Sequence, residues 1–173
     1  MAAPEVLIAA GDIAAAVVRL ASEIAGEYRS RNPVLLVILK GSFIFAADLV
    51  RRLDFPLEVE FIRASSYGGG TETSGRVRVD CTPRTSLRGR HVLVVEDIVD
   101  TGLTTSFVMD YVRRRRPASL RLCALLDKPA RRRVPLPVDY LGFSVPDRFL
   151  VGYGLDFDER YRNLPDICVL EEG

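Results

Sequence analysis

The stretch that decides the fold is Val92-Leu93-Val94-Val95-Glu96-Asp97-Ile98-Val99-Asp100-Thr101-Gly102-Leu103-Thr104-Thr105. Its continuously apolar start predicts a central parallel strand over residues 91–95. Apolar residues at helical spacing then predict a helix from about residue 102 to 115, and a second apolar strand follows over residues 120–126. Together these elements form a β-α-β unit, which indicates an α/β domain with a right-handed crossover.

The segments before this unit continue the alternation of helix and strand. Residues 12–29 show helical spacing with Asp12 as the expected cap, and Ser42 is expected to cap a second helix that ends near residue 53. Strands are predicted over residues 34–39 and 57–62. One side of the second helix is expected to carry Phe43, Ala47 and Val50. The sequence therefore predicts an α/β fold with a central, mostly parallel sheet flanked by helices.

The pattern changes after Lys128-Pro129. Three short strands are predicted at residues 138–141, 149–152 and 167–170, and prolines interrupt them. We therefore expect a single domain with a core and a small β-rich hood. The core spans about residues 34–130, and the hood is formed mainly by about residues 131–173 with the N-terminal segment.

A polar, glycine-rich segment lies over residues 65–76. Val77 and Val79 then alternate with polar residues, as in an exposed antiparallel strand. The segment is too long for a tight hairpin, and loops of this length are either functional or irregular connections. We favour a flexible lid loop that includes Ser66 and Tyr67, with a plain surface loop as the alternative.

Composition and charge exclude several classes of function. The chain has 173 residues, 48% of them hydrophobic, and a formal net charge of +1, so no global field draws it to nucleic acid or to a membrane. Cys81, Cys123 and Cys168 show no pairing pattern, which indicates reduced thiols that pack as small apolar residues. A single histidine, His91, argues against a zinc site and a Ser-His-Asp hydrolase. Without a signal peptide or a long apolar run, the protein is expected in the cytoplasm.

The carboxylates of the opening stretch indicate what its helix terminus binds. Ligands of parallel sheets bind beyond the carboxyl ends of the strands, and amides at a helix N-terminus form an anion site. Neither a Walker loop nor a dinucleotide fingerprint is present. Glu96, Asp97 and Asp100 would repel a phosphate unless they face hydroxyls or a divalent cation. A ribose phosphate with Mg²⁺ supplies both; the alternative is that these acids merely cap the helix.

This segment resembles the phosphoribosyl-pyrophosphate motif of the type I phosphoribosyltransferases, and the chain is similar to the purine-using branch of that family from about residue 39 to 170. The motifs that carry the resemblance are Leu39-Lys40-Gly41-Ser42, Ser66-Tyr67-Gly68, Glu96-Asp97-Ile98-Val99-Asp100-Thr101-Gly102, Leu126-Asp127-Lys128 and Val145-Pro146-Asp147-Arg148-Phe149-Leu150-Val151-Gly152-Tyr153-Gly154-Leu155-Asp156. The last two are specific to the purine branch. The resemblance implies the type I fold and a purine salvage enzyme that converts phosphoribosyl pyrophosphate and hypoxanthine or guanine into IMP or GMP and pyrophosphate.

The resemblance also implies which residues hold phosphoribosyl pyrophosphate. Glu96 and Asp97 would bind the ribose hydroxyls and, with Asp156, the Mg²⁺ ion. The 5′-phosphate would lie against Thr101, Gly102, Leu103, Thr104 and Thr105. Some relatives carry a lysine where this chain has Leu103. The pyrophosphate would be bound by Lys40, Gly41 and Arg162, with a strained peptide between Leu39 and Lys40.

On the purine side, the resemblance makes Asp100 the catalytic residue, which accepts a proton from N7 of the base or hydrogen-bonds to it. Lys128 would bind the 6-oxo group, Phe149 would stack on the ring, and Leu150 would contact the base edge with its backbone. The resemblance also places Asp156 among the purine-binding residues. Because a cationic sugar reacts readily with water, closure of the lid is expected during the reaction.

Other functions remain open at this point. A phosphoribosyltransferase for xanthine or for a pyrimidine is one alternative, and a non-catalytic regulator that senses phosphoribosyl pyrophosphate is another. The combined presence of Lys40, Asp100 and Arg162 and the low net charge argue against the regulator. The basic runs at residues 113–116 and 131–133 are expected to be solvated surface. A homodimer or homotetramer is expected from the resemblance alone.

Overall fold

The structure is a computed structural model that describes residues 4–66 and 77–170. Its helices are α1 (Ala10–Tyr28), α2 (Phe43–Val50), α3 (Leu103–Arg113) and the short 3-10 helix η1 (Pro129–Arg131). Its strands are β1 (Glu5–Ile8), β2 (Val34–Ile38), β3 (Glu58–Ser66), β4 (Val77–Cys81), β5 (His91–Val99), β6 (Ser119–Asp127), β7 (Tyr140–Ser144), β8 (Leu150–Val151) and β9 (Ile167–Val169). Tyr67 and the rest of the expected lid up to residue 76 lie outside the described residues.

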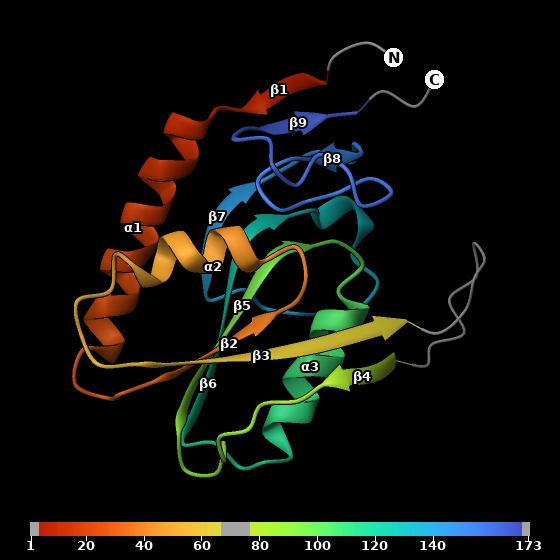
Figure 1. The fold of residues 1–173 in the computed structure, drawn as a ribbon. Coiled ribbons are helices and arrows are strands. Elements are labelled where there is room, and N and C mark those ends of the chain that lie inside the picture. The colour runs from red at the N-terminus through yellow and green to blue at the C-terminus, as the bar shows by residue number, and fades with distance from the viewer. Residues whose placement is uncertain (1–3, 67–76, 171–173) are drawn as a thin grey trace.

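The central sheet has six strands in the order β4-β3-β2-β5-β6-β7. The strands from β3 to β7 run parallel to their neighbours, and β4 pairs with β3 in the antiparallel direction. This arrangement confirms the predicted mostly parallel sheet and the predicted antiparallel strand that contains Val77 and Val79. Helices α1 and α2 cover one face of the sheet and α3 covers the other (Figure 1).

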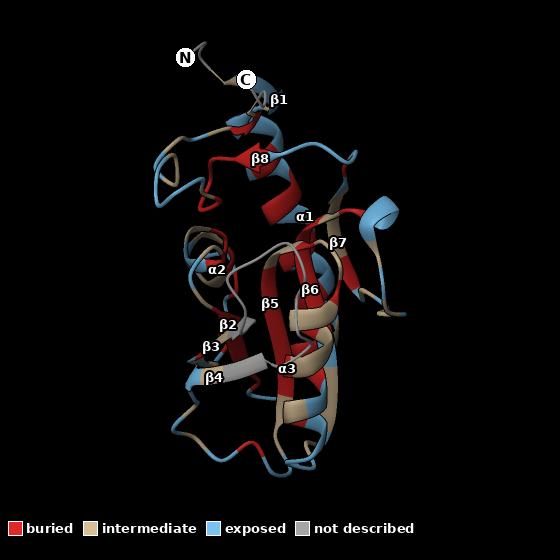
Figure 2. Cartoon of the chain, turned by 90° about the vertical axis from the view of Figure 1, so that its right-hand side faces the viewer, coloured by how far each residue is buried: buried red, intermediate tan, exposed pale blue. Residues whose placement is uncertain are grey.

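The two faces of the sheet bury alternate residues of the same strands. In β2, Leu35 and Val37 belong to the core that packs against α1 and α2, whereas Leu36 and Ile38 belong to the core that packs against α3. Because successive side chains of a strand point to opposite faces, a strand covered on both sides must be apolar at every position. The uninterrupted apolar runs of β2 and of the first half of β5 therefore have a direct cause, and both strands are buried in Figure 2.

A second, three-stranded sheet in the order β1-β9-β8 joins the N-terminal segment to the C-terminal part of the chain. Its residues Ile167 and Val169 extend the core formed by α1 and α2. A hydrogen bond of 2.6 Å from the Tyr153 hydroxyl to Asp48 Oδ2 also ties the loop after β8 to α2. This small sheet therefore sits above the carboxyl edge of the central sheet, on the side where the termini lie (Figure 1).

Three expectations about the elements were wrong. The strand expected at residues 138–141 is β7, which pairs in parallel with β6 and so belongs to the central sheet and not to the small one. The central strand expected to end at Val95 continues to Val99, so Glu96 and Asp97 lie within β5. Helix α2 buries Phe45, Ala46 and Leu49, while Phe43 and Ala47 are exposed.

The expected helix caps also differ from the observed ones. Ala9 is the N-cap of α1, and Asp12 lies inside the first turn. The first turn is instead reached by a distant carboxylate, because the Ala10 amide donates to Asp166 Oδ1 at 2.7 Å. Ser42 precedes α2 but makes no capping hydrogen bond, since its hydroxyl serves the site described below.

No helix in the described part of the chain is long and apolar enough to span a membrane.

Candidate active site

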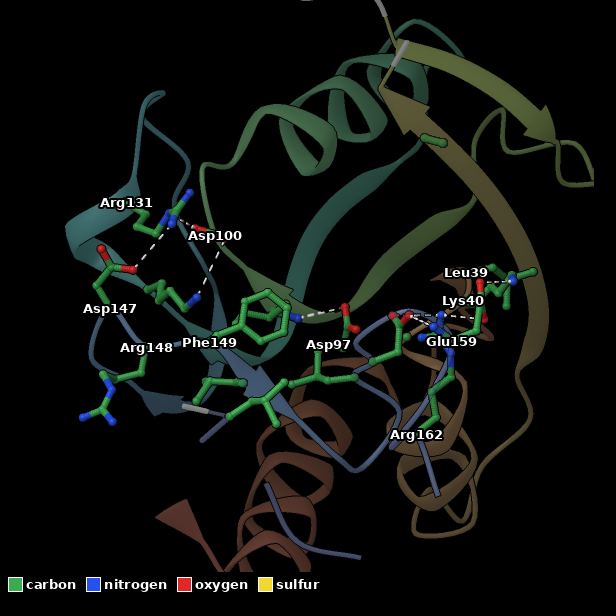
Figure 3. Close-up of a pocket in the computed structure, with 18 of the residues that line it drawn as sticks. Leu39, Lys40, Asp97, Asp100, Arg131, Asp147, Arg148, Phe149, Glu159 and Arg162 are labelled. Carbon is green, nitrogen blue, oxygen red and sulfur yellow. Dashed lines mark hydrogen bonds and ion pairs between the residues drawn. The ribbon is translucent and has the colours of Figure 1, made fainter. Parts of the chain in front are cut away.

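A pocket of about 1010 Å³ lies between the carboxyl edge of the central sheet and the small sheet. It is lined by residues that follow β2, end β3 and β5, follow β6, and flank β8. Because the strands are parallel, their carboxyl ends meet at one edge, and the polar residues there converge although they are far apart in sequence. Charged side chains gather at two separate ends of the pocket, with Asp97 and Phe149 between them (Figure 3).

Lys40 and Arg162 form one end of the pocket. Lys40 follows β2, and its peptide bond with Leu39 is cis. Arg162 donates to the carbonyl oxygen of Gly154 at 2.8 Å and pairs with Asp156 Oδ1 at 2.9 Å. Both cations also contact a single carboxylate, that of Glu159, at 2.7 Å from Lys40 Nζ and 3.2 Å from Arg162 Nη2. Two cations this close together are suited to an anion of more than one negative charge.

A buried polar cluster supports the floor of the pocket. The Ser42 hydroxyl accepts a hydrogen bond from the Asp97 amide at 2.9 Å and donates to Glu96 Oε1 at 3.2 Å. The Thr105 hydroxyl donates to Glu96 Oε2 at 3.0 Å. Burial is the main cause that raises the pKa of Glu96 well above its ordinary value, and the neighbouring Asp97 carboxylate raises it further. Glu96 is thus an internal acceptor for the hydroxyls of Ser42 and Thr105, and it holds Ser42 beside Asp97.

Two residues of this cluster that were expected to contact the substrate lie below the pocket surface. Glu96 is 6% exposed and Thr105 is 3% exposed, and neither lines the pocket. Asp97 does line it, and its position depends on Gly41, because a Cβ atom on Gly41 would lie 1.7 Å from Asp97 Oδ2. The Ile98 amide also donates to Asp97 Oδ1 at 2.9 Å. Asp97 is therefore the carboxylate of this pair that can meet a ligand directly.

Gly102 is the N-cap of α3 and has a positive φ of 81°. The first backbone hydrogen bond of the helix runs from the Ser106 amide to the carbonyl oxygen of Gly102 at 2.8 Å. The amides of Thr104 and Thr105 precede that bond, as is usual for the first turn of a helix, where an anion can bind. Residues 101–105, the expected phosphate turn, do not line the pocket. The turn follows Asp100, which does line it.

Asp100, Lys128 and Arg131 form the other end of the pocket (Figure 3). Lys128 is 6% exposed, and the nearest carboxylate oxygen among the described residues is Asp100 Oδ2, at 3.9 Å. Arg131 Nε pairs with Asp100 Oδ1 at 3.0 Å, and Arg131 Nη1 lies 3.7 Å from Asp147 Oδ1. A buried ammonium group without a close anion is well placed to donate to a neutral oxygen acceptor of a ligand.

Phe149 supplies an aromatic surface between the two ends of the pocket. Its side chain is 40% exposed, and its ring meets that of Phe157 edge to face, with centroids 5.5 Å apart and planes at 89°. The contact with Phe157 restrains the Phe149 ring, and Figure 3 shows this ring at the centre of the pocket. Leu150 is buried, and the carbonyl oxygen of Phe149 accepts from the Leu170 amide at 2.9 Å. The segment is therefore fixed where a flat ligand could stack.

The carboxylates named for Mg²⁺ do not form a closed metal site. Among residues 4–66 and 77–170, no three histidine, cysteine, aspartate or glutamate side chains gather closely enough to hold an ion. Asp97 and Asp156 both line the pocket, but Asp156 Oδ1 pairs with Arg162 and its Oδ2 accepts from the Glu159 amide at 2.9 Å. Mg²⁺ commonly binds one or two carboxylates together with oxygens of a phosphorylated substrate. The pocket fits an ion held in that shared way.

Several residues of the site were not expected from the sequence. Arg132 is partly buried and pairs with Asp127, so the expectation that this basic run is solvated was wrong for Arg132. Arg131 is exposed as expected, but it also lines the pocket, which the sequence did not indicate. Residues 113–116 are exposed, as expected. Glu159 was missed because no periodic pattern marks its loop. Lys40 and Lys128, by contrast, were expected in the site. They are the two lysines among 24 basic residues, and both line the pocket.

The cysteines follow their expectation in part. Cys123 and Cys168 are buried, and all three thiols are free. Cys81 is exposed at the edge strand β4, so its expected packing as a small apolar residue was wrong. His91 donates to or accepts from the Ser119 hydroxyl at 2.8 Å, at the end of the sheet opposite the pocket.

Comparisons with known proteins agree with this geometry. A family model described as a phosphoribosyl transferase domain matches residues 7–158. The chain is 46% identical to the hypoxanthine phosphoribosyltransferase of Haemophilus influenzae, with 97% of each chain covered. It is 44% identical to the hypoxanthine-guanine phosphoribosyltransferase of Bacillus subtilis, over 96% of this chain and 93% of that protein. The crystal structure of a hypoxanthine phosphoribosyltransferase from Staphylococcus aureus superposes with a TM-score of 0.93 at 40% identity, covering 96% of this chain and 91% of that one.

Proposed function

The chain belongs to the phosphoribosyl transferase family, and on this premise we propose that it is a purine salvage enzyme that transfers the 5-phosphoribosyl group of phosphoribosyl pyrophosphate to hypoxanthine or guanine. The products are IMP or GMP and pyrophosphate. A xanthine-using enzyme is the second candidate, because Lys128 can donate to the 6-oxo group of any of these bases.

The observation that carries the proposal is the separation of charge within one pocket. One end presents Lys40 and Arg162, which suit a pyrophosphate, and the other presents Lys128 and Asp100 beside the exposed ring of Phe149. A flat base with one acceptor and one proton to lose fits the second end. The ribose would then lie between the ends, against Asp97.

The proposed reaction replaces the C1–oxygen bond to pyrophosphate with a bond from C1 to a nitrogen of the base. Asp100 takes up the proton that the base must lose, while Lys128 holds the 6-oxo group and Phe149 orients the ring. Asp97 binds the ribose hydroxyls, and Lys40 and Arg162 receive the charge of the departing pyrophosphate. The first amides of α3 hold the 5′-phosphate at its outer oxygens, which fixes the sugar relative to both ends.

We propose that Asp97 and Asp156 would hold Mg²⁺ when phosphoribosyl pyrophosphate is bound, and that the ion would supply positive charge to the leaving group there. Glu96 contributes indirectly. It accepts a hydrogen bond from the Ser42 hydroxyl, which in turn accepts one from the Asp97 amide and so helps to position Asp97. We further propose that residues 65–76 act as the lid, that the small sheet is the hood of a single domain, and that the enzyme assembles as a homodimer or homotetramer.

The proposed function is tested by a spectrophotometric assay with phosphoribosyl pyrophosphate, Mg²⁺ and, in separate reactions, hypoxanthine, guanine, xanthine, adenine and uracil. Nucleotide formation with hypoxanthine or guanine supports the proposal. Turnover with xanthine at a higher kcat/KM than with the other two would favour the second candidate. Nucleotide formed from uracil alone, or from no base, would contradict the purine assignment.

The Lys128→Ala variant should lose purine recognition. Its ammonium group is buried beside Asp100 and has no closer anion among the described residues, so the variant removes the donor proposed for the 6-oxo group. We expect KM for hypoxanthine to rise about 10- to 100-fold, because a lost charged hydrogen bond costs about 1.5–3 kcal/mol. KM for phosphoribosyl pyrophosphate should change far less, and steady-state kinetics with each substrate varied in turn measures both.

Arg133→Ala is the matched control for this variant. Arg133 is an exposed neighbour in the same segment and does not line the pocket, so its removal takes away one positive charge without touching the proposed purine contact. Both Michaelis constants should stay near those of the unmodified enzyme. Equal damage to both substrates in Lys128→Ala would refute the assignment of Lys128 to the base.

A further inference from the structure

The carboxylate of Glu159 bridges the two cations at one end of the pocket. Its Oε1 lies 2.7 Å from Lys40 Nζ and its Oε2 lies 3.2 Å from Arg162 Nη2. Each oxygen thus faces a different cation, and the carboxylate spans the interval between them (Figure 3). Glu159 lines the pocket, although nothing in the sequence motifs or in the proposed reaction uses it.

This contact is of a kind that a stronger anion can displace. The side chains of Lys40 and Glu159 are 46% and 64% exposed, and exposed ion pairs between flexible side chains are weak. The carboxylate makes one contact with each cation, at 2.7 Å from Lys40 Nζ and 3.2 Å from Arg162 Nη2, so both contacts must be given up when another anion takes its place. A pyrophosphate carries several negative charges, whereas the carboxylate carries one.

The backbone of Glu159 is fixed independently of this ion pair. Its φ is 60°, in the left-handed region, and its amide donates to Asp156 Oδ2 at 2.9 Å. The side chain can therefore swing away from Lys40 and Arg162 while its Cα stays at the mouth of the site. When the pyrophosphate leaves, the same carboxylate is within reach to return to the two cations.

We propose that Glu159 is a built-in competitor for the pyrophosphate subsite: its carboxylate occupies Lys40 and Arg162 in the free enzyme, must be displaced when the pyrophosphate group binds, and promotes release of the product pyrophosphate. Only ion pairs are exchanged in this step, and no covalent bond changes. Glu159 thereby sets the affinity for the pyrophosphate group and takes no part in the bond changes between the ribose and the base. The inference rests on the proposed function, which places the pyrophosphate at Lys40 and Arg162.

The test compares binding of magnesium pyrophosphate to the unmodified enzyme and to Glu159→Gln by titration calorimetry. Glutamine keeps the size and the backbone contact but removes the competing charge, so pyrophosphate should bind about 3- to 10-fold more tightly. The gain should shrink as salt is added, because exposed charges are screened. In turnover, KM for phosphoribosyl pyrophosphate should fall, while KM for hypoxanthine should not change.

Asp158→Asn is the matched control. Asp158 is the exposed neighbour in the same loop, and it forms none of the ion pairs found among the described residues. The variant removes the same charge from nearly the same place, so pyrophosphate affinity should stay within about 2-fold if contact with the cations is what matters. An equal gain in pyrophosphate affinity in both variants would mean that the net negative charge of the loop matters and that the contact of Glu159 with the cations does not. That result would overturn the proposal.

A second measurement keeps the outcome interpretable. Because Lys40 and Lys128 are the two lysines of the chain, protein labelled with ¹³C at lysine Cε should give two side-chain resonances. We expect Glu159→Gln to shift the Lys40 resonance and to leave that of Lys128 in place. Weaker pyrophosphate binding in Glu159→Gln would mean that the carboxylate supports the ligand or its metal, which overturns the proposal. If the unmodified enzyme binds no pyrophosphate and forms no nucleotide, the proposed function fails first.

Discussion

Replacing Gly41 with alanine should lower kcat/KM for phosphoribosyl pyrophosphate at least about 100-fold, because the added methyl group takes the place of the Asp97 carboxylate. A Cβ atom on Gly41 would lie 1.7 Å from Asp97 Oδ2 and 2.7 Å from Asp97 Cγ. To make room, Asp97 must leave the Ile98 amide that now donates to it at 2.9 Å. The substitution therefore displaces the carboxylate that we propose binds the ribose, without changing Asp97 itself.

The fold should survive this substitution, since the displaced atoms belong to a side chain at the pocket surface. Gly26→Ala is the control: Gly26 lies exposed in α1, and a Cβ atom there meets nothing within 4 Å. It should leave kcat/KM unchanged and raise the free energy of unfolding by about 1 kcal/mol, because alanine favours helix over glycine. Kinetics and thermal unfolding measure both variants. A Gly41→Ala enzyme that keeps kcat/KM within about 3-fold would show that the position of Asp97 is not critical.

The central sheet could be predicted because its strands are buried on both faces. Residues 34–38 and 91–95 are apolar at almost every position, which is what two covering layers require. The same reasoning failed for α2. That helix is apolar almost all round, so its periodicity could not identify Phe45 and Leu49, and not Phe43, as the buried residues.

The polar cluster at the pocket floor shows a second limit of sequence reasoning. A serine before a helix is the usual sign of an N-cap, yet the Ser42 hydroxyl bonds to Glu96 and to the Asp97 amide, more than fifty residues away in sequence. Likewise, Asp166 Oδ1 accepts a hydrogen bond from the Ala10 amide in the first turn of α1, although the two residues are 156 positions apart in sequence. Such contacts depend on the tertiary arrangement, and local patterns carry no information about them.

The candidate site was predicted best where residues follow strands of the parallel sheet. Lys40, Asp100 and Lys128 each follow such a strand within two residues, and all three line the pocket. Glu159 and Arg131 come from a loop and a short 3-10 helix, where no periodicity applies. A run of arginines resembles solvated surface in composition, and only the fold places Arg131 within 3.0 Å of Asp100.

Asp100→Asn should keep the fold and the affinity for phosphoribosyl pyrophosphate but lower turnover at least about 10-fold, and up to the 10²–10⁴-fold that general base catalysis commonly contributes. The side chain is 39% exposed and asparagine has nearly the same size, so no cavity forms. The amide can still lie beside Arg131 and Lys128, but it cannot accept the proton that the base must lose. Steady-state kinetics with saturating phosphoribosyl pyrophosphate measures kcat, and calorimetry measures the affinity.

Asp147→Asn separates this role from a simple charge effect. Asp147 is the other carboxylate near Arg131, at 3.7 Å, so this variant removes a negative charge from the same end of the pocket. Its turnover should stay within about 3-fold of the unmodified enzyme. Comparable losses in both variants would mean that the charge around Arg131 matters and that Asp100 is not the proton acceptor.

The reverse reaction gives the stricter test of Asp100. A variant cannot change the equilibrium between base and nucleotide, so any lost stabilisation of the transition state must slow both directions. If Asp100 takes the proton in the forward direction, it must return that proton when pyrophosphate cleaves IMP, by the same path. Asp100→Asn should therefore lower kcat/KM for IMP formation and for IMP pyrophosphorolysis by the same factor, with the substrates of each direction varied to obtain kcat and the Michaelis constants. Unchanged turnover in both directions would remove Asp100 from the reaction and leave Lys128 and Phe149 as a site for binding alone.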